Sequence, residues 1–186
     1  KFISNLAINQ GGGVNLKKGT YTFSNCEFTS NRAGGEGGGL YFTRDDITAS
    51  IMGNSLSMIW IHIPSCTFTN NTAYSLEVNQ EVLLEITNRI IGFSGAISIS
   101  CTSGKIINIT NNFFSGNLAG GDGGAIHRKN EDCNVYIERN LFSGNIALDD
   151  GGAINNDRVN RQTRIYLNTF EGNRASDQGG ALRSNG

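Results

Sequence analysis

The chain has 186 residues, a formal net charge of −1 and 38% hydrophobic residues, with 25 Gly and a single Pro. This length suits one domain, and the chain is too apolar for a disordered glycine-rich segment. It has no basic run that would indicate a nucleic-acid or anionic-membrane partner. No apolar stretch reaches the roughly 18 residues of a membrane-spanning helix.

One pattern recurs six times: a Phe, an Asn three residues later, an Ala two further on, and then a Gly-rich element with an aliphatic residue. The Phe residues are Phe2, Phe28, Phe68, Phe114, Phe142 and Phe170, and the Asn residues are Asn5, Asn31, Asn71, Asn117, Asn145 and Asn173. The Gly elements occupy 11–14, 37–40, 94–97, 123–126, 151–154 and 179–182. The last three Phe are 28 residues apart. A period in this range is typical of a solenoid whose neighbouring repeats bury a common core.

Alternating residues upstream of each Phe predict a strand. Two apolar columns, five and seven residues before the Phe, are expected to face inward, and the residues between them are mostly polar. The first column contains Phe23, Ile63, Ile109, Ile137 and Ile165, and the second contains Tyr21, Ile61, Ile107, Val135 and Thr163. Each repeat has room for about three short strands. We therefore predict an all-β fold, a right-handed parallel β-helix of about six coils, in which residues 1–186 form one domain.

The motif residues have structural roles in such a fold. Phe occurs at the same position of every coil, a position called an address from here on. This predicts an interior aromatic stack. Asn tolerates left-handed turn geometry, and stacked amides bond to one another and to turn backbone. Ala is expected where a corner is tight, and the Gly pair where neighbouring coils approach closely. The repeat is thus first of all a folding device.

Two stretches interrupt the period, near residues 43–58 and 75–92. The second contains EVLLEITNRII, for which a strand pair and a short amphipathic helix are both open. Insertions in solenoids map to loops on one side, often the binding side. A loop that covers a sheet face is an equally good interpretation.

The four cysteines predict two disulfides. Cys26 and Cys66 both stand two residues before their Phe, so neighbouring coils place their Cα atoms within bridging range. Cys101 and Cys133 are offset by four residues and would meet only near a turn. Cysteines that can pair indicate an oxidising compartment, and none has the CxxC spacing of zinc or thioredoxin-like sites.

Two sequons, at Asn70 and Asn108, predict N-glycosylation if the source is a eukaryotic secreted protein. Asn108 lies between two inward Ile residues, so its side chain should face outward. Asn70 is expected at a turn beside the ladder residue Asn71.

The pairing of FxxN with GGA[I/L/V] resembles the repeat of chlamydial polymorphic outer membrane proteins, and related repeats occur in predicted protist surface proteins. The match is close for Phe114–Asn117 with 123–126, Phe142–Asn145 with 151–154, and Phe170–Asn173 with 179–182. The first three copies match loosely. The resemblance implies a β-helical, surface-displayed passenger with a role in cell adhesion. It implies architecture more firmly than it implies a ligand.

A catalytic site is not evident. The best acidic column lies eight residues after the Phe, where Asp122 and Asp150 would be about one coil apart and could shift each other's pKa or attract a cation. Acidic residues also simply initiate Gly turns, and we favour that explanation. Phosphate-loop and nucleophile-elbow motifs are absent, and no cofactor is expected. His127-Arg128-Lys129 resembles basic residues of pectin-degrading hydrolases, but its order relative to Asp149 and Asp150 differs.

Two functions from different classes therefore remain. The first is a non-enzymatic extracellular or cell-surface module, acting as a spacer, adhesin or filament component. The second is a carbohydrate-active β-helix enzyme, a polysaccharide lyase or hydrolase. An open coil end exposes unpaired strand groups. We therefore expect the chain to be a fragment of a longer protein, with other repeats or subunits covering both ends and with cell-surface glycans or proteins as partners.

Overall fold

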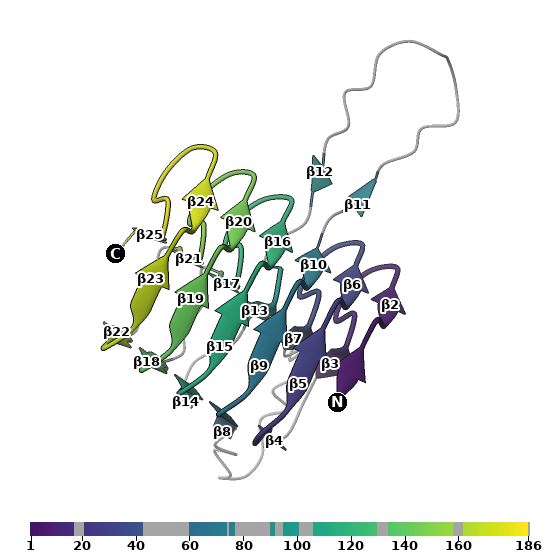
Figure 1. Ribbon diagram of the computed structural model, residues 1–186, viewed down its shortest axis with the longest axis horizontal. Coiled ribbons are helices and arrows are strands. Elements are labelled where there is room, and N and C mark those ends of the chain that lie inside the picture. Colours follow the sequence, from purple (N-terminus) through teal and green to yellow (C-terminus); the bar gives the residue numbers. More distant parts are fainter. Residues whose placement is uncertain are drawn as a thin grey trace, which may run out of the picture.

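The computed structural model describes residues 1–16, 21–42, 60–73, 75–76, 90–91, 95–100, 106–129, 134–157 and 162–185. These residues form a parallel β-solenoid without a helix, and its two chain ends lie at opposite ends of the stack (Figure 1). This confirms the predicted fold class. The right-handed sense of the coils stays a prediction.

Four parallel sheets run along the solenoid, each named here by its characteristic residue. The Phe sheet contains β1 (Phe2–Ile3), β5 (Glu27–Thr29), β9 (Thr67–Thr69), β15 (Phe113–Ser115), β19 (Leu141–Ser143) and β23 (Thr169–Glu171). The Ala sheet contains β2 (Leu6–Ala7), β6 (Arg32–Ala33), β10 (Thr72–Ala73), β16 (Leu118–Ala119), β20 (Ile146–Ala147) and β24 (Arg174–Ala175).

The other two sheets complete each coil. The Gly sheet contains β3 (Val14–Leu16), β7 (Leu40–Phe42), β13 (Ile97–Ile99), β17 (Ile126–Arg128), β21 (Ile154–Asn156) and β25 (Leu182–Ser184). The Ile sheet contains β4 (Tyr21–Thr22), β8 (Trp60–Pro64), β14 (Ile106–Thr110), β18 (Asn134–Glu138) and β22 (Thr163–Tyr166). In the described part of the chain, three sheets have six strands and the Ile sheet has five, so the complete four-stranded coils there are slightly fewer than the six expected.

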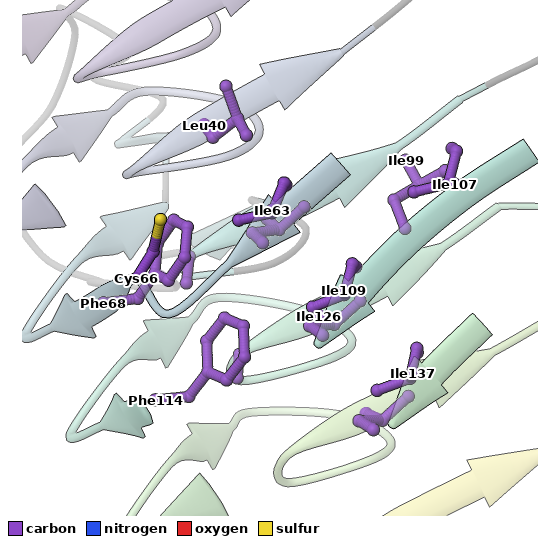
Figure 2. Close-up of a cluster of buried hydrophobic side chains, with 14 of the residues drawn as sticks. Leu40, Ile63, Cys66, Phe68, Ile99, Ile107, Ile109, Phe114, Ile126 and Ile137 are labelled. Atoms are coloured by element: carbon purple, nitrogen blue, oxygen red, sulfur yellow. The ribbon is translucent and has the colours of Figure 1, made fainter. Parts of the chain in front are cut away.

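The six repeat Phe residues form one interior column, as predicted. Each pairs in register with the Phe of the next coil, and successive ring centroids are 4.7–5.0 Å apart with interplanar angles of 3–11°. The Ile columns pack beside this stack. Figure 2 shows Ile63, Ile109 and Ile137 around Phe68 and Phe114, all of them fully buried. The register predicted from the sequence is therefore confirmed.

Each coil turns twice by the same two-residue device, a residue with positive φ followed by a ladder residue. At the Phe–Ala corner the positive-φ residues are Ser4, Ser30, Asn70, Gly116, Gly144 and Gly172, and the repeat Asn follows each of them. At the Ile–Phe corner they are Asn25, Ser65, Asn111, Arg139 and Leu167. The expectation that the repeat Asn itself adopts the left-handed turn is wrong, because the preceding residue does so and leaves the Asn side chain free to bond inward.

The repeat Asn residues form a continuous amide ladder. In the buried rung at Asn71, the backbone N–H and Nδ2 both donate to Asn117 Oδ1, at 3.0 Å each. Nδ2 also donates to the carbonyl of Phe28 at 2.9 Å. Every polar atom of the amide is therefore satisfied inside the coil, which explains why a buried polar side chain recurs.

The Gly pair has two separate duties. Its first residue, such as Gly123 or Gly151, has a φ of +64°. At its second residue, a Cβ on Gly124 would lie 2.1 Å from the backbone oxygen of Gly152 in the next coil. One position thus needs the backbone freedom of Gly, and the other needs its lack of a side chain.

The insertion near 43–58 lies outside the described residues. Of the insertion near 75–92, the described residues form an antiparallel pair between β11 (Ser75–Leu76) and β12 (Ile90–Ile91). This pair stands outside the solenoid stack (Figure 1). The described residues of this insertion therefore form a strand pair, which was one of the two predicted alternatives.

Candidate functional site

Asp122 and Asp150 lie one coil apart at the turn before β17 and β21, where the sequence placed them. Together with Asp149 they bring carboxylate oxygens within 4.8 Å of one another. The backbone N–H of Asp150 donates to Asp122 Oδ1 at 3.2 Å, and that of Gln178 donates to Asp150 Oδ1 at 2.9 Å. One oxygen of Asp122 and one of Asp150 therefore bond to the next coil.

The second carboxylate oxygens belong to a charge network on the outer face of the Gly sheet. His127 is only 2% exposed, and its Nε2 lies 2.9 Å from Asp157 Oδ2 and 3.9 Å from Asp122 Oδ2. Arg183 Nε lies 3.0 Å from Asp150 Oδ2, and its Nη1 lies 2.9 Å from Asp157 Oδ1. Asp157 thus bridges His127 on β17 and Arg183 on β25, two coils apart.

Asp157 and Arg183 were not singled out from the sequence. His127 and Arg183 share one address of the Gly sheet with Asn155 between them, as the strand register shows. This address follows an aliphatic core residue, so a charged side chain there must point outward. The inward–outward alternation found upstream of the Phe also holds in the strand that follows the Gly element. Following it there would have identified Arg183 as an outward charged residue.

The surroundings shift the pKa values of the carboxyls in opposite directions. Burial is the main cause that raises the pKa of Asp122. The hydrogen bond with His127 is the main cause that lowers the pKa of Asp157. The pKa of Asp149 is raised, first by burial and then by the charges of Asp150 and Asp177. Burial therefore disfavours the charged form of Asp122, whereas the hydrogen bond with His127 favours the charged form of Asp157.

Two ligand sets of suitable type for a cation occur among the described residues, Asp122 with His127 and Asp157, and Asp122 with Asp149 and Asp150. The guanidinium of Arg183, however, already forms ion pairs with Asp150 and Asp157 and supplies positive charge there. A groove lies at the Ile–Phe corner. Neither Arg183 nor any side chain of the two ligand sets lines it. The cluster is best explained as a network that fastens three coils.

Cys26 and Cys66 lie at the same address of neighbouring coils, next to Glu27 and Thr67, which pair in register. Both are thiols in this structure. The Cys66 thiol donates to the Phe23 carbonyl at 3.1 Å, and its sulfur accepts the Cys26 N–H at 3.4 Å. Burial raises the pKa of Cys66 to about 11. The Cys26–Cys66 disulfide stays a prediction, and Cys101 and Cys133 lie outside the described residues.

These thiol contacts reproduce those of an Asn. At the same address, Asn112, Asn140 and Asn168 form a second amide ladder, in which Asn112 Nδ2 donates to the Ile63 carbonyl at 2.8 Å and to Asn140 Oδ1 at 2.9 Å. Asn112 Oδ1 in turn accepts the Cys66 N–H at 2.8 Å. Cys66 therefore takes the place of one rung. The sequence showed the Asn column but not that it is bonded.

The two sequon residues lie at accessible positions. Asn108 is half-buried on β14 between the buried Ile107 and Ile109, so its side chain faces outward. Asn70 is exposed at the Phe–Ala corner with a φ of 52°, beside the buried Asn71. Glycosylation of either stays a prediction.

No helix among the described residues has the length and apolar character needed to cross a membrane.

Four stretches match the Chlamydia polymorphic membrane protein repeat: residues 25–43, 113–127, 141–157 and 169–185. Each stretch runs from the Phe sheet through the Ala sheet into the Gly sheet of one coil. The chain matches no curated protein and no solved structure. The resemblance drawn from the FxxN and GGA[I/L/V] elements is thus confirmed, and four coils of this β-solenoid contain the Chlamydia polymorphic membrane protein repeat.

Proposed function

We propose that this solenoid is a non-enzymatic extracellular or cell-surface module that serves in adhesion or as a spacer or filament component. The observation that carries the proposal is the fourfold match to a repeat of a polymorphic membrane protein. The internal bonding supports it, because the repeat Asn side chains and the carboxylates of Asp122 and Asp150 bond to neighbouring coils. Residues that could perform chemistry are thereby engaged in holding the coils together.

The coil ends favour contacts with further repeats or subunits. Among the described strands, β1 and β3 at one end and β23 and β25 at the other pair on one side only. The core is also less covered there, since Phe2 and Phe170 are half-buried whereas Phe28 to Phe142 are fully buried. An uncovered strand edge above an apolar core favours pairing with another chain.

Adhesion is tested by coupling the purified chain to latex beads and counting beads bound to cultured epithelial cells. We expect specific binding that soluble chain competes away, while beads carrying heat-denatured chain bind at background level. Beads that bind no better than this control on any of several cell types would leave only the spacer and filament roles.

End-to-end contacts are tested separately by multi-angle light scattering over a range of protein concentrations. We expect the average mass to rise with concentration, because uncovered coil ends pair. A mass that stays at 20.0 kDa throughout contradicts the end-pairing proposal without bearing on adhesion.

The alternative is a carbohydrate-active β-helix enzyme, favoured by the opposite pKa shifts of Asp122 and Asp157 on either side of His127. Glycoside hydrolysis uses two carboxyl groups, and the one that acts as general acid has a raised pKa. Reducing-sugar release from a panel of polysaccharides tests it. Turnover that disappears in both Asp122→Asn and Asp157→Asn would replace the surface-module proposal.

A further inference from the structure

A shallow groove of about 480 Å³ follows the Ile–Phe corner across several coils. One wall is formed by the positive-φ residues Ser65, Asn111, Arg139 and Leu167, and the floor by the second amide ladder at Asn112 and Asn140. The other wall is formed by outward residues of the Phe sheet, Thr67, Phe113, Leu141 and Thr169. Figure 1 shows this corner where β8, β14, β18 and β22 lead into β9, β15, β19 and β23.

The side chains of this groove depart from what the backbone favours. A positive φ suits Gly and Asn, yet Arg139 has a φ of 53° and Leu167 a φ of 52°. Bulky residues adopt this conformation at a cost of about 1–2 kcal/mol each. Strain of this kind is concentrated at binding sites in proteins and points to a role for the side chain.

Apolar groups also reach solvent beside the groove. Phe113 is 37% exposed and Leu167 is 57% exposed, and Leu141 lies beside Phe113 in the register of the Phe sheet. In the earlier coil the same outward address holds Thr67. At this outward address the apolar residues are therefore Phe113 and Leu141, with Thr67 before them and Thr169 after them.

Among the described residues that line the groove, Arg139 carries a charge and no carboxylate is present. Arg139 is largely exposed, and its Nη1 lies 3.7 Å from Glu138 Oε2, a separation beyond a direct hydrogen bond. The remaining polar lining consists of hydroxyl and amide groups and the thiol of Cys66. This combination suits a ligand with hydroxyl groups, apolar ring faces and a negative charge.

Spacing and backbone pairing argue against an extended peptide as the ligand. Groove residues of one kind recur at the coil separation of about 4.8 Å, whereas same-face side chains of an extended peptide recur at about 6.8 Å. The backbone groups of β9, β15 and β19 are paired within the Phe sheet, so this corner offers no strand edge to a peptide.

We infer that this groove binds an acidic oligosaccharide lying along the solenoid axis. A sugar ring packs on Phe113, the guanidinium of Arg139 bonds a carboxylate or sulfate, and the hydroxyl and amide groups bind sugar hydroxyls. The inference rests on the proposed adhesion function and names its ligand class.

Isothermal titration calorimetry of the full chain at 150 mM NaCl tests it with three probes: a heparin hexasaccharide, a hexagalacturonate and maltohexaose. The heparin probe carries both sulfates and carboxylates, the hexagalacturonate carries carboxylates only, and maltohexaose is neutral. We expect at least one acidic probe to bind about tenfold more tightly than maltohexaose, because one charge-assisted contact accounts for about that factor. Tight binding of hexagalacturonate would show that a carboxylate is sufficient, whereas binding of the heparin probe alone would show that sulfate is needed.

Two matched pairs of variants locate the site. Arg139→Gln should weaken the acidic probe about tenfold, whereas Arg164→Gln removes an exposed arginine of the Ile sheet outside the groove and should leave binding unchanged. Phe113→Ser should weaken it about fivefold, whereas Ile146→Ser alters an equally exposed apolar residue of the Ala sheet, at 39%, and should have no effect.

Absence of acidic-probe binding, equal binding of maltohexaose, or equal effects within a variant pair would each overturn the inference. Beads carrying the chain provide the separate readout of adhesion. Beads that still adhere while the probes fail would remove the glycan ligand and keep the adhesion proposal, with a protein receptor as the outcome. If the probe binds but the beads fail to adhere, the groove keeps its glycan ligand and the adhesion proposal is removed.

Discussion

The Ile–Phe and Phe–Ala corners turn the chain with the same backbone, a left-handed residue followed by a ladder residue, yet they contain different side chains. At the Phe–Ala corner every left-handed residue is Ser, Asn or Gly, and every ladder residue is Asn. At the Ile–Phe corner the left-handed position includes Arg139 and Leu167, and the ladder begins with Cys26 and Cys66. Backbone geometry alone explains the residue types at the Phe–Ala corner. The residue types at the Ile–Phe corner also need an explanation from the surface that they form.

If the two amide ladders stabilise the coils in the same way, they should contribute similarly to the free energy of unfolding. Asn117→Ala would leave the buried N–H of Asn71 and the carbonyl of Phe68 without partners, so we expect a loss of about 3 kcal/mol in the free energy of unfolding. Asn112→Ala should cost slightly less, because Asn112 Oδ1 accepts one N–H instead of two. Urea denaturation at 25 °C measures both.

Asn173→Ala serves as the control for these ladder variants. Asn173 occupies the last rung and is half-buried, so the groups it releases can reach water, and we expect a loss of about 1 kcal/mol. A loss at Asn117 no larger than at Asn173 would mean that the interior ladder is not what holds the coils.

Cys66 tests whether a thiol replaces an amide rung. Under reducing conditions Cys66→Asn should match or exceed the wild-type free energy of unfolding, because the new amide can donate to the Phe23 carbonyl and accept the Cys26 N–H. Cys66→Ala should lose about 2 kcal/mol, since a buried group and both contacts disappear. A Cys66→Asn variant as unstable as Cys66→Ala would contradict the comparison.

The same residue bears on the predicted cross-link. We expect non-reducing peptide mapping of protein secreted from eukaryotic cells to find Cys26–Cys66 joined. In the reduced protein, iodoacetamide should modify Cys66 slowly at neutral pH, because burial raises its pKa to about 11 and little thiolate is present. Peptide mapping that finds both thiols free in secreted protein would remove the case for a disulfide here.

The acidic network should respond to pH through two residues of opposite behaviour. Asp157 has a lowered pKa, so its pairing stabilises the protein above its unfolded pKa of about 3.9 and is lost as the pH falls through the folded value. Asp122 has a raised pKa, so its contribution decreases as the pH rises from the unfolded value through the folded one.

Two Asn variants separate these contributions. At pH 7, Asp157→Asn should lower the free energy of unfolding by about 1 kcal/mol, whereas Asp122→Asn should leave it unchanged or raise it slightly, since Oδ1 still accepts the Asp150 N–H. Both differences should shrink toward pH 3. Equal losses at pH 7 would show that Asp122 is stabilised by His127 more than it is penalised by burial.

The fold was predictable because its determinants repeat in the sequence. The Phe column, the Asn ladder and the inward Ile residues each return at one address per coil, so a single register places them all. The charge network was only half predictable: Asp122 and Asp150 recur at one address, but Asp157 and Arg183 occur once each and meet only through the stacking of β17, β21 and β25. Stacking also creates the groove, whose two walls and floor come from three different addresses of the repeat.

The smallest expected effects test the corners themselves. Gly144 at the Phe–Ala corner has a φ of +62°, and a Cβ there would meet nothing within 4 Å, so Gly144→Ala should cost only the conformational penalty of about 1 kcal/mol. Leu167→Asn at the Ile–Phe corner should instead raise the free energy of unfolding by a few tenths of a kcal/mol, because Asn tolerates a positive φ. Differential scanning calorimetry can resolve both as shifts in Tm. If Leu167→Asn lowers the Tm, Leu167 contributes packing that exceeds its strain, and its presence at the groove needs no ligand to explain it.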